Sequence, residues 1–304
     1  MINLRYHIVS LAAAFLAFGL GILAGTSVIN TGLVNSLRTN TVTLQKNLNE
    51  VRTNVSQLQK QLGVGDDFGR AISPSLLQGR LAGRAVVLLV DDKVPGALLS
   101  QVDEALRLAG AKPPAQITLT DRWVLDGPDT IGQLIQATGT SATARDAVLQ
   151  DAAGRLGSRL GSSSDPRADG DLIRSLSDAG FLDIRDLPAA GSFPAANALV
   201  TVVTSGDAQQ VPSDDGFFIP LLKALYPLRI VAVTEPTTAE QSLAELVRSD
   251  RAMARAVCTV DHVDTVAGRL SLAYGLRALI NGKAATHYGV RAGATAVAPD
   301  LRSA

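Results

Sequence analysis

The polar side chains that could carry out chemistry in this sequence stand where short apolar runs end. The run Ala85–Val90 is followed by Asp91 and Asp92. The ends of later runs carry Asp121, Ser205, Asp207, Glu235, Asp261 and Asp264. If the runs are parallel strands, their carboxyl ends share one sheet edge, where open α/β sheets bind ligands. The pattern therefore allows a small ligand or a divalent cation there. The alternative is that these residues only lead strands into loops, with Asp264 as the N-cap of the next helix.

The candidate ligands for a transition metal are Cys258, His262 and His287, because thiolate and imidazole groups bind such ions. Cys258 and His262 are four residues apart, about 13 Å along a strand at ~3.3 Å per residue, which is too far to share one ion. His287 reaches His262 only if the tail folds back. We therefore expect no dedicated metal cluster. Cys258 is the only cysteine, so it forms no internal disulfide and is expected to be a small buried apolar residue.

No catalytic motif accompanies these residues. The sequence contains no P-loop, no GxGxxG after a strand, and no HExxH, GxSxG or CxxC motif, the patterns that mark the common nucleotide, metal and acyl-transfer sites. Its 28 Lys and Arg residues balance 28 Asp and Glu residues, which predicts no nucleic-acid partner. We therefore expect that the protein is not an enzyme. The alternative is an enzyme that uses the strand-end carboxylates.

The elements that would position these residues form an α/β pattern over residues 80–282. Strands are predicted at Ala85–Val90, Gln116–Leu119, Ala198–Val203, Arg229–Val233 and Ala256–Val263. Helices are predicted at Gly96–Ala109, 141–160, 170–180 and Asp264–Ile280. The strands are continuously apolar, which is typical of a parallel sheet covered on both faces, so we predict a Rossmann-like, mostly parallel domain. Because no strand contrasts an apolar with a polar face, the chain is not expected to form a pore by itself. Residues 63–79 are predicted to be a linker and residues 283–304 a flexible tail.

A heptad repeat over residues 30–62 predicts a coiled-coil stalk. Apolar or near-apolar residues recur at alternating steps of three and four, the pattern of a left-handed coiled coil. The a positions are Val34, Thr41, Leu48, Val55 and Leu62, and the d positions are Leu37, Leu44, Val51 and Leu58. Leucine-rich d positions with partly β-branched a positions favour a parallel homodimer. The alternative is an amphipathic helix packed on its own domain. Gly63 and Gly65 are predicted to end the helix.

Residues 8–29 are apolar and uncharged, which is long enough to cross a bilayer as a helix of about 20 residues. The segment exceeds the usual apolar core of a signal peptide, about 7–15 residues, so we predict a retained, single-pass signal anchor. Arg5 precedes it, which favours residues 1–7 in the cytoplasm and the bulk of the chain outside the cell membrane. Gly21 and Gly25 form a GxxxG pair that would let two such helices approach closely.

Two blocks of the sequence resemble a known family. The first is Asn3-Leu-Arg-Tyr-His-Ile-Val-Ser-Leu-Ala-Ala-Ala-Phe-Leu-Ala, and the second is Cys258-Thr-Val-Asp-His-Val-Asp-Thr-Val-Ala-Gly-Arg followed by Leu279-Ile-Asn-Gly and His287-Tyr-Gly. With the order of anchor, coil and α/β region, they resemble the actinobacterial, MctB-like copper transporter family. The tail departs from the family pattern, which tends to have glycine where Thr286 stands and a second histidine near Arg291.

The resemblance implies copper efflux or homeostasis at the cell envelope, with copper as the implied metal. SteB-like relatives imply instead a role in daughter-cell separation together with an envelope or division membrane protein. The residues themselves favour a non-enzymatic, dimeric coiled-coil scaffold that binds partner proteins in cell-wall remodelling. Both functions predict the same architecture.

Overall fold

The computed structural model describes residues 4–187, 191–207 and 213–301, with the backbone alone at 4 and 26–34. The chain divides into two compact units, Met1–Gly65 and Asp66–Ala304. We call the second unit the head.

Helix α1 runs from Leu4 to Leu77, so the prediction that Gly63 and Gly65 end the helix is wrong. A glycine inside a helix costs only about 1 kcal/mol relative to alanine. Packing in the head offsets this cost, because Leu77 is 1% exposed within the apolar core. The helix stops before Gly79, whose φ of +74° lies in the left-handed region that suits glycine after a helix. Most of the predicted linker 63–79 is therefore helical.

Within α1, the segment Arg5–Gly25 is long and apolar enough to cross a membrane, by its length and composition. It is the one helical segment with these properties among the described residues. The segment has no buried residues. This finding agrees with the predicted position of an anchor.

The head is built on a seven-stranded sheet in the order β3-β2-β1-β4-β5-β6-β7. The strands are β1 Val86–Val90, β2 Ala115–Leu119, β3 Leu182–Arg185, β4 Leu199–Val203, β5 Val231–Thr234, β6 Val257–Val260 and β7 His287–Tyr288. Neighbouring strands are parallel except β2 and β3. The predicted mostly parallel α/β fold is therefore confirmed.

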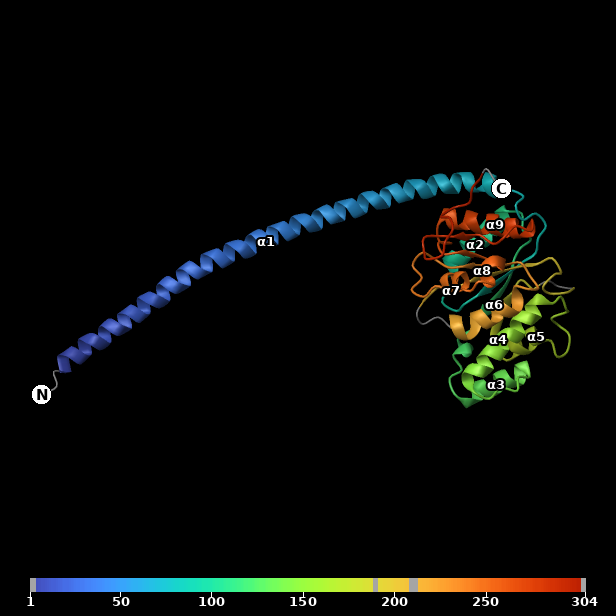
Figure 1. Ribbon diagram of the computed structural model, residues 1–304, viewed down its shortest axis with the longest axis horizontal. Helices are drawn as coiled ribbons and strands as arrows, with labels where there is room; N and C mark the ends of the chain where they lie inside the picture. Colours follow the sequence, from blue (N-terminus) through green and yellow to red (C-terminus); the bar gives the residue numbers. More distant parts are fainter. Residues whose placement is uncertain (1–3, 188–190, 208–212, 302–304) are drawn as a thin grey trace. The chain divides into compact units, whose positions relative to one another are not determined.

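Helices cover both faces of the sheet (Figure 1). They are α2 Gly96–Leu108, α3 Pro128–Thr138, α4 Arg145–Gly161, α5 Leu172–Asp178, α6 Ile219–Leu225, α7 Leu243–Ser249, α8 Met253–Ala256 and α9 Val266–Ile280, with short turns of 3-10 helix at Asp121–Val124 and π-helix at Asp214–Phe218. Along β1, Val87 and Leu89 face the core under α3–α8, while Val86, Leu88 and Val90 face the end of α1, α2 and α9. Two-sided burial is the reason that this strand is apolar at every position.

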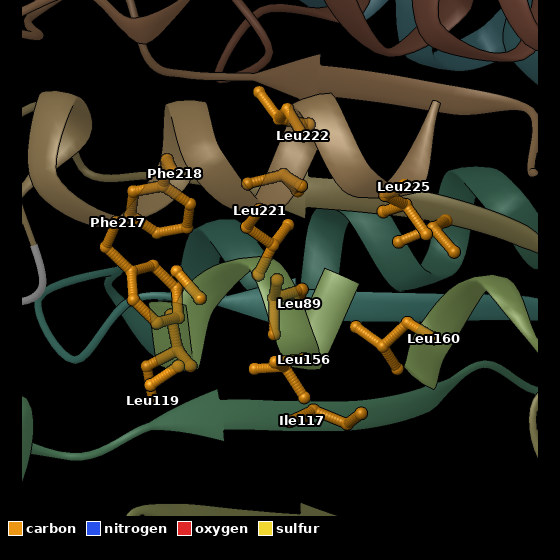
Figure 2. Packing of buried hydrophobic residues seen from close by; sticks show 14 of the residues in the cluster. Leu89, Ile117, Leu119, Leu156, Leu160, Phe217, Phe218, Leu221, Leu222 and Leu225 are labelled. Carbon is orange, nitrogen blue, oxygen red and sulfur yellow. The ribbon is translucent and has the colours of Figure 1, made fainter. Parts of the chain in front are cut away.

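The larger core lies between the sheet and helices α4 and α6. Figure 2 shows Leu156 and Leu160 of α4 and Leu221 of α6 close to the strand residues Leu89 and Ile117. Gly157 allows this approach, because a Cβ at that position would lie 2.3 Å from the carbonyl oxygen of Leu221. This core fixes β1, β2 and β4 and thereby the edge at which they end.

The sequence prediction missed β3 and β7, and the predicted flexible tail 283–304 is wrong where it is described. His287 and Tyr288 pair with Thr259 and Val260 of β6. Tyr288 is also bridged to Ala296. The tail has no periodic apolar pattern, so its order comes from contacts with the head. Residues 302–304 lie outside the described part of the chain.

Candidate functional site

The carboxyl ends of β1, β4, β5 and β6 share one edge of the sheet, as predicted, because these strands are parallel. The connections run in opposite directions on the two sides of the boundary between β1 and β4. Such a switch point is the usual place for a ligand in an open α/β sheet. A cleft of about 460 Å³ lies there. Its polar lining includes Lys93, Gln101, Ser205, Asp207, Glu240 and Asp264.

Asp91 joins two strand ends by binding two residues of the cleft lining, Lys93 and Ser205. Its side chain is 1% exposed and accepts hydrogen bonds from the backbone N–H groups of Lys93, at 2.7 Å, and Ser205. Burial raises the pKa of Asp91 to about 6, and the bonds from Ser205 and Lys93 oppose this rise. Asp91 therefore braces β1 against β4. The neighbouring Asp92 lies 3.6 Å from the ammonium group of Lys93.

Glu235 follows β5 and is buried completely. Its carboxylate accepts hydrogen bonds from the hydroxyl of Ser242 and from the backbone N–H of Ala244, at 3.1 Å. Burial raises the pKa of Glu235, against the effect of these bonds. Since Ser242 is the N-cap of α7, Glu235 fixes the start of that helix.

Asp261 follows β6 and forms the most buried ion pair of the site. Its carboxylate lies 2.7 Å from the guanidinium of Arg248, and the two side chains are 0% and 2% exposed. Asp261 also accepts the backbone N–H groups of Val290, at 2.9 Å, and Arg291, at 3.2 Å. Arg248 donates further to the carbonyl oxygen of Tyr288 at 3.0 Å. The pair therefore holds the tail against β6.

Asp264 is not the N-cap of α9, so this detail of the structural alternative is wrong. The cap is Thr265, whose hydroxyl accepts the backbone N–H of Gly268 at 3.0 Å. Asp264 instead accepts the N–H and the hydroxyl of Thr237 at 2.8 and 2.9 Å. It thereby fixes the loop after β5 beside the cleft.

Asp207 lines the cleft on the loop after β4. Its backbone N–H donates to the hydroxyl of Ser205 at 3.3 Å. Between them, Gly206 has a φ of +65°, and a Cβ there would lie 2.1 Å from Cβ of Ala239. The loop therefore needs glycine at this position, both for its backbone and for its close approach to the loop after β5.

The three candidate metal ligands are held in separate environments. Cys258 is buried, and burial raises its thiol pKa to about 12. The imidazole of His287 lies 3.0 Å from the hydroxyl of Thr259 and 2.9 Å from the carbonyl oxygen of Ala254. His262 is 5% exposed, and its Nδ1 lies 3.9 Å from Asp261. Burial lowers the pKa of both histidines.

No group of three or more His, Cys, Asp or Glu side chains is placed to hold a metal ion in the part of the chain that the structure describes. The strand-end edge thus combines an open cleft, where Asp207 and Asp264 stand, with buried carboxylates that serve as structural braces. Sequence reasoning missed the partners of these braces, above all Arg248 and Arg291, because no motif marks them.

The residues predicted to mediate dimerisation lie on α1 outside the head. Their apolar side chains are exposed, from 46% at Val55 to 70% at Leu62. The others in this set are Leu37, Leu44, Leu48, Val51 and Leu58. At Gly21 and Gly25, a Cβ would meet no atom within 4 Å.

Comparison with known proteins gives full-length matches. The model of the family described as "Copper transport outer membrane protein, MctB" matches residues 1–299. The copper transporter MctB of Mycobacterium tuberculosis strain H37Rv is 26% identical over 314 residues, which cover 98% of this chain and 99% of the relative. The copper transporter MctB of Mycobacterium leprae strain TN is 28% identical with the same coverage.

Proposed function

Because the chain belongs to the MctB family of copper transport outer membrane proteins, we propose that it acts in copper homeostasis at the cell envelope. The observation that carries this proposal is the extent of the family match, from residue 1 to residue 299. It includes the apolar helix as well as the α/β head, so the whole architecture is that of the family. The mycobacterial relatives, which are named copper transporters, cover the chain to the same extent.

The protein is anchored by Arg5–Gly25 as a single-pass membrane protein, with its amino terminus in the cytoplasm and its head outside. The length and hydropathy of this segment support the anchor. Arg5, at its amino-terminal end, supports the orientation through the positive-inside rule. Alkaline phosphatase fused to the carboxyl terminus is then active in intact cells, because this reporter folds only outside the cytoplasm. An inactive fusion that is present in full amount would reverse the orientation.

The protein does not conduct copper by itself, and its role is not catalytic. A path through a membrane usually carries polar side chains inside the bilayer, and residues 8–29 offer only Ser10, Thr26 and Ser27. The braces Asp91, Glu235 and Asp261 are occupied by hydrogen bonds within the head, which supports a structural role for them. Copper therefore moves through a membrane partner that this protein assists.

Copper content of cells tests the proposed function directly. Cells that lack the protein are expected to accumulate copper when grown with added copper salts. The full chain restores the normal content, whereas a chain that lacks residues 1–25 does not, because its head is no longer held at the membrane. Equal copper contents with and without the protein would refute the role in copper homeostasis.

A copper titration of the purified full chain in detergent tests whether the head holds the metal. The separate placement of Cys258, His262 and His287 supports a head without a tight copper site. We expect binding weaker than micromolar that is the same in the Cys258→Ala, His262→Ala and His287→Ala variants. A micromolar site that disappears in one of these variants would show instead that the head itself binds copper.

The exposed apolar side chains of α1 favour a second function, a dimeric coiled-coil scaffold that binds partner proteins in cell-wall remodelling and daughter-cell separation. Cells that lack the protein would then fail to separate after division while their copper content stays normal. This pair of measurements distinguishes the two functions, because copper homeostasis predicts the opposite result for each.

A further inference from the structure

The a and d positions of the heptad repeat form an apolar stripe along α1, which is exposed in one part and packed against the head in another. From Leu37 to Leu62, the a and d side chains are large, apolar and exposed, apart from Thr41. In the same heptad register, the next a positions are Gly69 and Leu76. A Cβ at Gly69 would lie 2.9 Å from the side chain of Val266 in the head, and Leu76 packs on the core of the head. The head therefore covers the stripe from Gly69 onward.

The uncovered part has the length and composition of a coiled-coil seam. Residues 37–62 span nearly four heptads, which is the length at which a repeat specifies a stable coiled coil. The one polar residue in the seam, Thr41, donates its hydroxyl to the carbonyl oxygen of Leu37 at 2.8 Å. Because this donor is satisfied within its own helix, Thr41 enters an apolar interface without an unpaired hydrogen-bond donor.

The flanking positions fit a second copy of the same chain. In a parallel pair in register, each g position meets the e position five residues later in the other chain. These pairs are Asn40 with Gln45, Asn47 with Arg52 and Asn54 with Gln59. None of them brings two like charges together, so the arrangement carries no electrostatic penalty.

We infer that residues 37–62 pair with the same residues of a second copy, in parallel and in register, and that this seam ends before Gly69. The parallel direction rests on the proposed anchor, because two chains that leave one membrane through the same apolar segment point the same way. Beyond the seam, each α1 helix packs against the other elements of its own head. The assembly is therefore a pair of heads joined through one shared stalk.

Cross-linking of the full chain in its native membrane tests this inference. Leu44→Cys and Leu58→Cys place thiols at d positions of the seam. Lys46→Cys and Lys60→Cys, two residues along from each, place them on the opposite face as matched controls. The native Cys258 adds no background, because it is buried with a thiol pKa of about 12, and only the thiolate reacts.

With a short bismaleimide, we expect covalent dimers at positions 44 and 58, at least about fivefold more abundant than at positions 46 and 60. Similar yields at the seam and control positions would mean random collision and would overturn the inference. No dimer at position 44 or 58 would overturn it as well. A mixture of the two seam variants that links only position 44 to position 58 would show an antiparallel pair.

Light scattering of the detergent-solubilised wild-type chain provides a measurement without substitutions, and we expect the mass of two copies. The result is independent of the proposed function. If the chain cross-links at positions 44 and 58 but cells that lack the protein have a normal copper content, the paired seam is supported and the copper role is refuted. If no cross-links form but cells that lack the protein have a raised copper content, the seam is refuted and the copper role is supported.

Discussion

Single buried residues of the strand-end edge hold together parts of the chain that are far apart in sequence. Arg248 and Asp261 illustrate this, because their ion pair also binds the backbone of the tail at Val290 and Tyr288. Breaking a buried pair from one side leaves the other charge without a partner, which costs about 3–5 kcal/mol. The stability of the head therefore depends more on this pair than on the exposed ion pairs.

Replacing Arg248 by alanine should lower the free energy of unfolding by about 3–5 kcal/mol, because the Asp261 carboxylate stays buried. Urea unfolding can be followed by the fluorescence of Trp123, the only tryptophan, which is 1% exposed. The matched control is Arg155→Ala, whose pair with Asp151 is 44% and 42% exposed. We expect the control to lose less than about 1 kcal/mol. Equal losses in the two variants would contradict a special role for the buried pair.

Asp91 should make the head less stable as the pH rises through the weakly acidic range. Burial raises its pKa in the folded head from 3.8 to about 6, so the folded state binds the proton more tightly than the unfolded state. The resulting stabilisation is fully present below pH ~4 and is lost as the pH rises through 6, which amounts to about 3 kcal/mol. The lowered pKa values of His262 and His287 act in the opposite direction, so a comparison with a variant is required.

The difference in unfolding free energy between the wild type and Asp91→Asn isolates this residue, because the other groups cancel. Asparagine keeps the size of the side chain but does not titrate. Between pH 4 and pH 7, the unfolding free energy of the wild type should fall by about 3 kcal/mol relative to that of Asp91→Asn. A difference that is constant over this range would mean that the folded state does not perturb Asp91.

At the residue scale, the sequence predicts where the strand-end carboxylates lie but not which role they have. Asp91, Glu235 and Asp261 are predicted from their place after apolar runs, and all of them lie at the expected edge. Their role as braces depends on partners such as Ser205, which is 114 residues from Asp91 in sequence. No local pattern encodes a pairing over that distance, so the sequence left the choice between ligand and structural roles open.

Among the elements, helix α9 depends on a close backbone contact in its first turn. At Gly268, a Cβ would lie 1.9 Å from the carbonyl oxygen of His262. The Gly268→Ala variant therefore has to shift α9 or the loop before it, which we expect to destabilise the head by about 3 kcal/mol. At Gly154 in α4, a Cβ would meet no atom within 4 Å.

Gly154→Ala is thus the matched control, and it should stabilise the head by about 0.5–1 kcal/mol through helix propensity. Thermal unfolding of both variants, followed by circular dichroism, gives the comparison. Opposite signs for the two substitutions are expected. If both variants were stabilised, α9 would not be in close contact with the loop after β6.

At the element scale, two-sided burial made the central strands easy to predict and the edge strands difficult. β1 and β4 are buried at every position and read as apolar runs. β3 alternates between buried and exposed positions, and β7 has only two residues. The tail that contains β7 is ordered by Arg248 from a different element, and such a contact leaves no periodic signal.

For the whole molecule, the sequence predicted the order of apolar segment, heptad helix and α/β head, because each of the three has its own residue pattern: an unbroken apolar run, a heptad repeat, and short apolar runs alternating with helical stretches. It did not predict where α1 ends. The heptad pattern stops at Leu62, whereas the helix continues to Leu77 because the head packs against its last turns. The end of the repeat therefore marks the end of the proposed seam, and the end of the helix marks its attachment to the head.

The combined substitution Leu44→Asp and Leu58→Asp tests whether the stalk and the head are independent. In a paired stalk it would bury four carboxylates, two from each copy, against apolar side chains, which is unfavourable without partners. We expect light scattering to show a single chain in detergent. Unfolding followed by Trp123 should be unchanged, because both positions lie outside the head. The matched control is Thr39→Asp with Thr53→Asp, which has the same spacing on the outer face of α1 and should stay dimeric. A double seam variant that remains dimeric would place the interface elsewhere on the molecule.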